Sequence, residues 1–165
     1  MSATAGLGRR LLSLLYEALL LVALLFIAGF ALAPFVSPSG SAAAHTLGIP
    51  SLPARIAAFG ALTLLGALFY GWCWSDGRRT LPMKTWHLAL ATRDGGPVPR
   101  RAALLRYLAW WIGPSLGLVG YALLRPHGLG AVAVPLLLAN YLAALVDPEQ
   151  QFLHDRVAGT RVVTS

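Results

Sequence analysis

Four long apolar segments, separated by short polar ones, constrain the fold of this chain more than any other feature. They cover residues 11–36, 54–75, 102–124 and 129–146. An α-helix needs about 20 consecutive apolar residues to cross the hydrocarbon core of a bilayer, so each segment is close to the length of one crossing. The sequence therefore predicts an all-α membrane protein with four transmembrane helices, in a single domain over residues 1–165.

The composition points the same way. Hydrophobic residues make up 57% of the chain and charged residues 12%, whereas about a quarter of a soluble domain is charged. The net charge of +7 could indicate nucleic acid. In a membrane protein, however, basic residues commonly reflect topology and contact with anionic lipid. We therefore expect anionic lipid headgroups as partners, and no nucleic acid.

No motif of a soluble enzyme is present. The chain has no Gly-x-Ser-x-Gly sequence, no phosphate-binding loop and no pair of histidines at the spacing of a helical metal site. Its single cysteine, Cys73, cannot form an intrachain disulfide. We expect a protein that is not an enzyme and that needs no cofactor or metal.

The first apolar segment has two interpretations. Arg9-Arg10 before it resemble the basic start of a signal peptide, and a Ser-Pro-Ser-Gly-Ser cluster at 37–41 follows it. The segment is longer than the apolar part of a signal peptide, which has roughly 7 to 15 residues, and it contains Glu17. A retained helix ending near Pro34 is the favoured interpretation.

Basic residues predict the orientation in the membrane. Of the 13 Lys and Arg residues, two precede the first segment, six lie in the loop 76–101 and two in the tail 147–165. By the positive-inside rule, this loop, this tail and both termini are cytoplasmic. Between the third and fourth segments, Arg125-Pro126-His127-Gly128 is a short turn, which predicts an antiparallel helical hairpin.

The loop and the tail also contain candidate strands. Residues 85–92 alternate loosely between apolar and polar, and Asp94-Gly95-Gly96 is a turn signal. The tail residues 160–164 are mostly β-branched. Because an isolated two-stranded hairpin is marginally stable, we expect the tail to add a strand to a hairpin within the loop. The product is a small cytoplasmic sheet.

Glu17 is the first candidate for function. An ionised carboxylate about two turns inside an apolar helix must find a partner, bind a proton or face water. Arg10 lies seven positions earlier, near the same helical face, and Arg9, Ser13 and Glu17 follow an i, i+4, i+8 spacing. Glu17 is either the titrating group of a proton or cation relay, or one half of a buried ion pair that fixes helix packing.

Further candidates lie near the ends of the later segments. Asp155 either accepts hydrogen bonds from nearby arginines in a cluster at the membrane face, or accepts them from backbone N–H groups and so anchors its loop. Arg106 either extends to the headgroups or acts as a counter-ion for the acids. His154 could move protons near neutral pH or bind a carbonyl, and Asn140 could hydrogen-bond another helix.

Three short motifs resemble one family. They are Arg9-Arg10 with an acid shortly after, residues 80–86 (TLPMKTW), and residues 154–160 (HDRVAGT). Together they resemble the RDD family of bacterial integral membrane proteins, over Arg9 to Val163. Glu17 stands where the family usually has an aspartate, and Pro82 where it has a glycine. The resemblance implies the membrane architecture; some members are similar to sodium–proton antiporters and others to accessory proteins.

The sequence thus favours a multi-pass protein of the bacterial inner membrane that transports protons or a monovalent cation, as a homodimer because four helices leave little room for a path. Its candidate polar cluster comprises Arg9, Arg10, Glu17, Arg106 and Asp155, with His154, Arg156 and Asn140 as further members. The alternatives are a non-catalytic accessory subunit of a larger membrane complex and a protein that binds lipid headgroups.

Overall fold

The computed structural model describes residues 5–36 and 50–164, so the cluster at 37–41 lies outside the described residues. In chain order its elements are α1 (Leu7–Val36), α2 (Leu52–Cys73), α3 (Leu81–Thr85), β1 (Leu88–Thr92), α4 (Arg100–Trp110), α5 (Ile112–Leu124), η1 (Arg125–His127), η2 (Gly130–Leu138), α6 (Ala139–Val146), α7 (Leu153–Ala158) and β2 (Thr160–Thr164).

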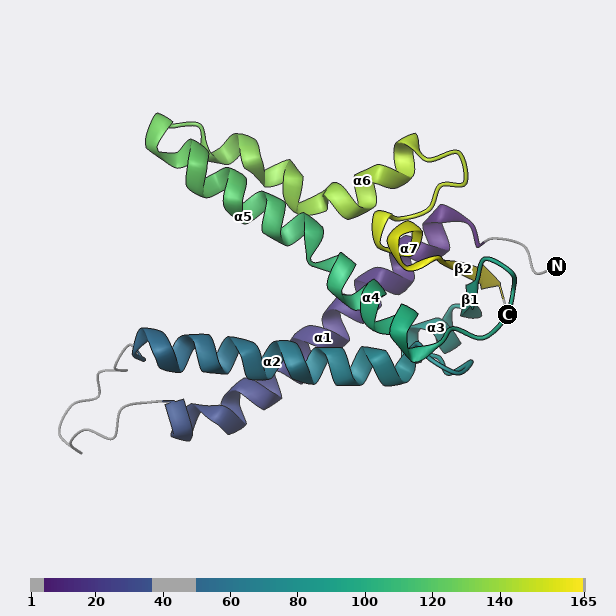
Figure 1. The fold of residues 1–165 in the computed structure, drawn as a ribbon, viewed down its shortest axis with the longest axis horizontal. Helices are drawn as coiled ribbons and strands as arrows, with labels where there is room; N and C mark the ends of the chain where they lie inside the picture. Colours follow the sequence, from purple (N-terminus) through teal and green to yellow (C-terminus); the bar gives the residue numbers. More distant parts are fainter. Residues whose placement is uncertain (1–4, 37–49, 165) are drawn as a thin grey trace.

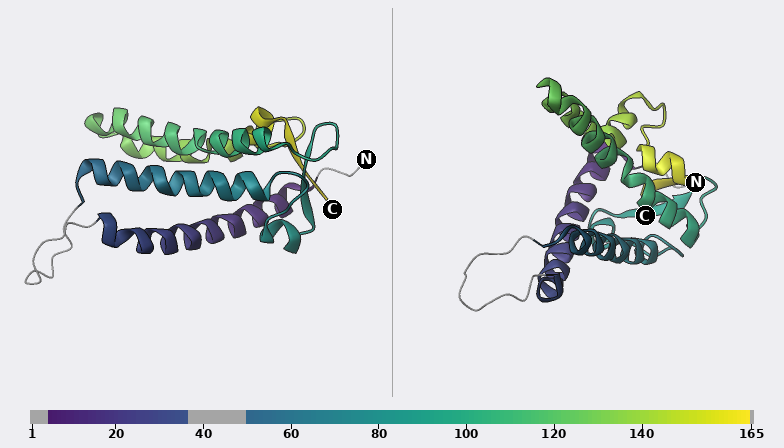
Figure 2. Two further views of the ribbon diagram at one scale, coloured as in Figure 1. Left: turned by 60° about the horizontal axis from the view of Figure 1, so that its bottom comes forward. Right: turned by 60° about the vertical axis from the view of Figure 1, so that its left-hand side comes forward.

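The helices form two arms that meet at one end. The first arm consists of α1 and α2, which cross each other, and the second consists of α5 packed against η2 (Figure 1). The arms diverge away from α3, α4, α7 and the two strands, while their long axes keep the same general direction (Figure 2). The start of α1 and the end of β2 both lie at the end where the arms converge, which we call the base.

Three helical stretches are long and apolar enough to cross a membrane. They are Leu7–Pro34, Leu52–Cys73 and Arg100–His127, and in the most apolar part of each only 11%, 17% and 22% of the residues are buried. Leu, Phe and Ile side chains therefore cover most of the outer surface of the arms, as expected for helices surrounded by lipid. The prediction of a mostly helical membrane protein is confirmed.

The third and fourth predicted helices are each interrupted. A turn at Trp111 separates α4 from α5, because Pro114 has no N–H to continue the helical hydrogen bonds. The fourth segment divides into nine residues of 3₁₀-helix, which contain Pro135, and eight residues of α-helix. The fourth segment is shorter than the other three, so the prediction of four complete transmembrane helices is confirmed only in part.

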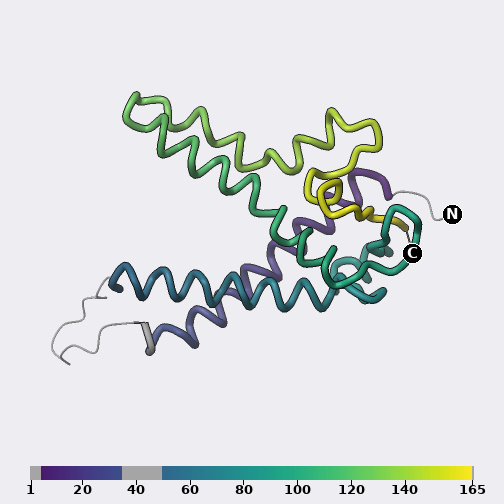
Figure 3. Tube along the Cα trace, viewed as in Figure 1, coloured from purple at the N-terminus to yellow at the C-terminus, as the bar shows by residue number. Residues whose placement is uncertain are grey.

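The predicted hairpin of the third and fourth segments is confirmed. A Cβ added at Gly113 would lie 2.6 Å from the carbonyl oxygen of Leu137, and one added at Gly120 would lie 3.1 Å from the Cβ of Ala133. The reversed order of these contacts makes α5 and η2 antiparallel, and the glycines allow the two backbones to approach closely. Their connection turns at Gly128, with φ of 74°, at the far end of the arm (Figure 3).

The sheet has two antiparallel strands, β1 and β2, with Leu90 opposite Val162. The prediction that the tail adds a strand is confirmed, whereas the hairpin within the loop is wrong. Its turn does form, since the N–H of Gly95 donates to the carbonyl of Thr92 over 2.9 Å. Pro97 and Pro99 then leave too few backbone donors for a returning strand, so the chain passes directly into α4.

The densest packing is at the base. The buried apolar core there includes Tyr70 and Trp74 from α2, Tyr107 from α4, and Leu90 and Val162 from the sheet. The backbone N–H of Ala5 donates to the carbonyl of Val162 over 3.2 Å, which ties the start of α1 to the sheet. The base therefore holds the inner ends of the helices in fixed positions.

Candidate functional site

A cluster of buried polar side chains lies where the helices meet the base. Arg10, Ser13 and Glu17 come from α1, Arg106 from α4, and His154 and Asp155 from α7, with Thr80 and Thr160 beside them. Each of these side chains is at most 6% exposed. The structure therefore brings together residues from both halves of the chain, as the sequence predicted for Glu17, Arg106 and Asp155.

Arg106 and Asp155 form the centre of this polar cluster. Arg106 Nε donates to Asp155 Oδ1 over 2.8 Å, with both side chains at most 2% exposed. The guanidinium also lies 4.3 Å above the ring of Trp74. Because Arg106 is fully buried, the alternative that it extends to the lipid headgroups does not hold. Its partner comes from a segment 49 residues away along the chain.

Asp155 is stabilised in its charged form. Burial by itself raises the pKa of this carboxyl group, but the charge of Arg106 and the hydrogen bonds from Arg106 and Thr160 outweigh burial, so the pKa lies below its ordinary value. Thr160 Oγ1 donates to Oδ1 over 3.2 Å. Oδ2 is buried without a protein partner among the described residues. One oxygen of Asp155 therefore keeps its capacity to accept a hydrogen bond.

His154 is neutral. Its pKa lies at about 4, because burial and the nearby charge of Arg106 lower it by more than the charge of Asp155 raises it. Its Nε2 lies 3.3 Å from Arg106 Nη2. Since a guanidinium only donates, Nε2 must accept and the proton resides on Nδ1. With such a low pKa, His154 is an acceptor for Arg106 and carries no charge near neutral pH.

Glu17 is buried but joins no arginine directly. Its Oε1 accepts from Thr80 Oγ1 over 2.7 Å, and no ion pair within 4.0 Å reaches it from the part of the chain that the structure describes. A small cavity of about 10 Å³ is lined by Glu17 together with Trp74, Arg106 and His154. Such a volume holds about one water molecule.

The two neighbouring arginines of α1 have different environments. Arg10 is 2% exposed and its guanidinium lies 5.3 Å from the ring centre of Phe152, whereas Arg9 is exposed. Nε and Nη1 of Arg10 are buried without a protein partner among residues 5–36 and 50–164. The polar face of α1 therefore includes Arg10 but not Arg9, although the sequence analysis had placed both in the cluster.

Arg156 lies outside the cluster. It pairs with Asp147 and lies 3.6 Å from Glu149, at the surface of the turn before α7. The hydrogen bond from Arg156 keeps the pKa of Asp147 below its ordinary value. Asp147 Oδ2 also accepts from the backbone N–H of Gln151 over 2.6 Å. This group of side chains fixes the orientation of α7 and thereby the positions of His154 and Asp155.

Asn140 satisfies a backbone group that a proline leaves free. Pro114 has no N–H, so the carbonyl of Trp110, four residues earlier, loses its helical donor. Asn140 Nδ2 donates to this carbonyl over 2.7 Å and lies 3.3 Å from the carbonyl of Ala109. The geometry agrees with the interpretation of Asn140 as a contact between helices. The Asn140 amide also hydrogen-bonds a carbonyl that could otherwise line an ion path.

Sequence reasoning missed two partners of the cluster, Thr80 and Trp74. Thr80 caps α3, where its Oγ1 accepts from the N–H of Met83 over 3.3 Å while donating to Glu17. The Thr-Leu-Pro sequence is a recognisable helix start and could have indicated the cap, although not the contact with Glu17. Trp74 is 4% exposed and its ring covers the Arg106 guanidinium, a contact between elements that no local pattern indicates.

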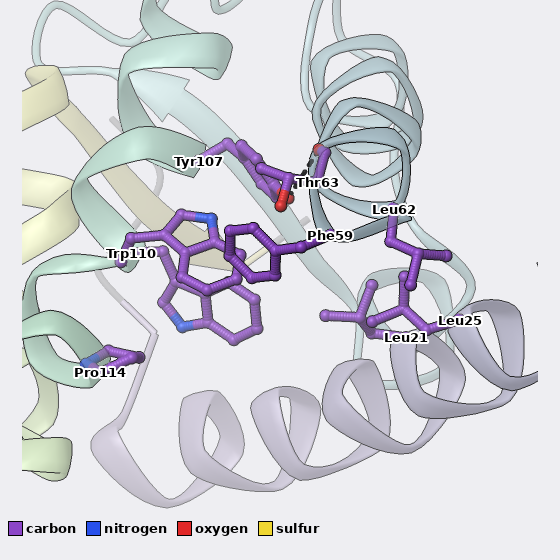
Figure 4. Close-up of a pocket in the computed structure, with 9 residues that line it drawn as sticks. Leu21, Leu25, Phe59, Leu62, Thr63, Tyr107, Trp110 and Pro114 are labelled. Atoms are coloured by element: carbon purple, nitrogen blue, oxygen red, sulfur yellow. Dashed lines mark hydrogen bonds between the residues drawn. The ribbon is translucent and has the colours of Figure 1, made fainter. Parts of the chain in front are cut away.

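An apolar pocket of about 270 Å³ lies between α1, α2 and the junction of α4 with α5. Figure 4 shows Leu21 and Leu25 of α1 facing Leu62 of α2, with Phe59 beside the ring of Trp110. No ionisable carboxylate, histidine or lysine lines it, and the hydroxyl of its tyrosine donates to the carbonyl of Thr63 over 3.0 Å. This pocket offers no polar path beyond the cluster.

Comparison with known proteins supports the architecture. The RDD family model matches residues 4–159, which is most of the chain. No curated protein and no solved structure matches the chain significantly. The match covers all the elements that carry the polar cluster except the strand that follows α7.

Proposed function

The chain belongs to the RDD family, and from this premise we propose that it is a four-span protein of the bacterial inner membrane that moves protons or a monovalent cation. Family membership establishes a membrane protein and leaves its activity open. The proposal therefore depends on the geometry of the polar cluster and on the topology of the helices that carry it.

Two features support four crossings. Both described ends lie at the base, which requires an even number of crossings if the arms span the bilayer (Figure 1). At about 2.0 Å per residue the 3₁₀-helix η2 is about 18 Å long, and at about 1.5 Å per residue α6 adds about 12 Å. The total of about 30 Å matches the hydrocarbon core, because a 3₁₀-helix extends further per residue.

The positive-inside rule supports a cytoplasmic base. The loop 76–101 that connects α2 to α4 carries six basic residues and belongs to the base, whereas the far ends of the described helices carry Arg55 and Arg125. In this orientation the polar cluster lies at the cytoplasmic end of the membrane-spanning region, with both termini in the cytoplasm.

The observation that carries the proposal is the environment of Glu17. Its carboxylate is buried, receives one hydrogen bond from Thr80, and faces a cavity with room for one water molecule. One donor of the cavity wall, Arg106 Nη1, has no protein partner within the described residues. A water molecule or a cation in this space would connect Glu17 to the Arg106–Asp155 pair. The Glu17 carboxylate could then bind or release a proton or a cation while the base stays folded.

The roles of the other groups follow from charge. Glu17 would bind the proton or the cation, and the unpartnered Oδ2 of Asp155 would accept it at the cytoplasmic side. Arg106 and Arg10 would set how strongly Glu17 and Asp155 bind the proton or cation, because their positive charges repel a cation and stabilise both carboxylates. Since the pocket beyond the cluster is apolar, a complete path requires further polar surface, and we propose that a second copy of the chain supplies it.

The experiment is a transport assay in proteoliposomes that contain a pH-sensitive dye. We expect the wild-type protein to dissipate an imposed pH gradient in the presence of Na⁺, K⁺ or Li⁺. Glu17→Gln removes the titrating group and should abolish this dissipation. The matched control is Glu149→Gln, because Glu149 carries the only other glutamate side chain and is 61% exposed.

The outcomes separate clearly. Loss of flux in Glu17→Gln with retention in Glu149→Gln supports the role of Glu17. Unchanged flux in a folded Glu17→Gln protein removes Glu17 from the mechanism. If the folded wild-type protein dissipates no gradient with any of the three cations, the transport function itself is refuted.

A second candidate function is that of an accessory subunit. The exposed basic side chains Arg93 and Arg101 line an open pocket of about 520 Å³ on the base, beside the start of α4 and the end of α7. Such a surface fits an acidic partner protein. Stoichiometric retention of a larger membrane complex during purification in mild detergent, lost in Arg93→Glu/Arg101→Glu, would support this function.

A further inference from the structure

A pocket rich in basic residues lies where α2 leaves the membrane. It has a volume of about 360 Å³ and is lined by Trp72, Cys73, Gly77, Arg78, Arg79 and Lys84, without a carboxylate in its wall. Arg78 is fixed in place, because its guanidinium lies 4.1 Å from the ring centre of Trp72 and its Nε donates to the carbonyl of Trp72 over 2.8 Å. The pocket is therefore a preformed concentration of positive charge.

An apolar groove adjoins this pocket. It has a volume of about 190 Å³, runs between α2 and α4, and is lined by Ala67, Leu68, Gly71, Trp72, Arg100 and Leu104. Gly71 and Ala67 make it possible, since a Cβ added at Gly71 would lie 3.0 Å from a methyl group of Leu104. Trp72 belongs to both walls and is 61% exposed, so the groove and the basic pocket adjoin at this side chain.

Both features lie at the level of the lipid headgroups. Trp72 is next to the last residue of the membrane-length helix Leu52–Cys73, and Arg100 is the first residue of the membrane-length stretch Arg100–His127. Tryptophan and basic side chains are the residues enriched at this depth. The groove extends from there along the helices toward the hydrocarbon core.

We propose that one anionic phospholipid binds here, with its phosphate in the basic pocket and an acyl chain in the groove between α2 and α4. Arg78 already donates from Nε to Trp72 and from Nη2 to Ser75 and Asp76, so it contributes a fixed charge and the N–H groups of Nη1. Lys84 contributes a mobile point charge with three donors. Three basic side chains of the two walls, Arg78, Lys84 and Arg100, are opposed by one carboxylate among the described residues, Asp76, which lies 2.7 Å from Arg78 and 3.6 Å from Arg100. The excess positive charge selects an anionic lipid over a zwitterionic one.

The position of a basic pocket directly beside an apolar groove favours a lipid as the occupant. A free phosphate would use only the basic pocket and would leave the groove without a function. An acidic peptide would have to place a chain of apolar atoms along the membrane-facing groove between Leu68 and Leu104. A phospholipid carries both chemical groups in the order that the pocket and the groove present. This inference does not depend on transport by the polar cluster.

The test uses the full chain reconstituted in vesicles of phosphatidylglycerol in phosphatidylcholine, with bromine atoms on the acyl chains of one lipid at a time. Bromine quenches nearby tryptophan fluorescence. At constant lipid composition, we expect stronger quenching when the bromine is on phosphatidylglycerol, because that lipid accumulates beside Trp72. Trp72→Phe should remove the difference while the other tryptophans keep a common background.

Two double variants separate the site from total charge. Lys84→Gln/Arg100→Gln removes two exposed charges at the site and should lower the preference for phosphatidylglycerol by roughly 30-fold, about fivefold for each charge. Arg93→Gln/Arg101→Gln removes the same charge elsewhere on the base and should leave the preference unchanged.

The remaining results would overturn the proposal. Equal quenching by the two brominated lipids shows that no phosphatidylglycerol is selected. Equal losses in both double variants show attraction by total charge only. If excess inorganic phosphate abolishes the difference in quenching, the pocket binds a phosphate group without help from the groove, and the assignment to a lipid is wrong.

Discussion

His154 should make the stability of this protein depend on pH over a specific range. In the unfolded chain the imidazole takes up a proton near pH 6.5, whereas in the folded protein burial lowers its pKa to about 4. Between these values the unfolded state binds more protons than the folded state. Folding stability is therefore fully present above pH 6.5 and decreases as the pH falls toward 4.

The size of the effect follows from the difference between the two pKa values. Each pH unit between 6.5 and 4 removes up to about 1.4 kcal/mol of the free energy of unfolding, and the whole range removes about 3 kcal/mol. Asp155 contributes in a different range, because its pKa is lowered and its stabilising charge is lost only as the pH falls below the ordinary aspartate range.

The assay is equilibrium unfolding in lipid–detergent micelles from pH 7 to pH 4, with wild type compared to His154→Gln. Glutamine keeps an acceptor for Arg106 but cannot be protonated. The advantage of the wild type over the variant should therefore shrink by about 3 kcal/mol across the range. The exposed His127 provides the control, and His127→Gln should follow the wild type.

The reasoning would be refuted by parallel curves. If wild type and His154→Gln lose stability equally at every pH, the imidazole does not change its protonation on folding. A buried, neutral His154 would then be incorrect, and with it the assignment of Nε2 as an acceptor for Arg106.

Two further predictions concern buried polar contacts. Asp155→Asn leaves the charge of Arg106 buried without a counter-ion and should cost about 3–5 kcal/mol of unfolding free energy. The apolar double variant Arg106→Met/Asp155→Leu should cost less than the sum of its two single substitutions. If the costs of the two single substitutions simply add, the two residues do not form a direct pair. Asn140→Leu leaves the Trp110 carbonyl without its side-chain donor and should cost roughly 1–3 kcal/mol of unfolding free energy. The cost should be clearly smaller in a Pro114→Ala background, because alanine restores a backbone N–H that can donate to this carbonyl. Equal costs in both backgrounds would show that Asn140 stabilises the protein through another contact.

Part of the polar cluster could be predicted from helix geometry. Residues seven positions apart on an ideal α-helix differ in direction by only about 20°, which places Arg10 close to the face of Glu17. Residues eight apart differ by a much larger angle, and Arg9 is indeed exposed. The same periodicity could not identify the partner of Glu17, because Thr80 is 63 residues away and belongs to a different element.

The sheet shows a similar division. The β-branched composition of the tail was sufficient to predict β2, since strand propensity is a local property. The predicted hairpin in the loop 76–101 is only half present. The strand β1 forms, but the described chain after the turn at Gly95 forms no second strand. Whether a turn leads to a hairpin depends on the donors of the following residues and on which other edge is available, and here β2 provides that edge.

The sequence by itself determined that this protein is a bundle of membrane-length helices, because the transfer of an apolar segment into lipid depends on its own length and composition. Only the tertiary structure decided how the buried charges are satisfied. Arg106 pairs with Asp155 across 49 residues, and Glu17 turns to Thr80 and a small cavity instead of an arginine. The physical reason is that a buried charge interacts over a few ångströms, so its partner is fixed by how separate helices pack together and by no pattern along the chain.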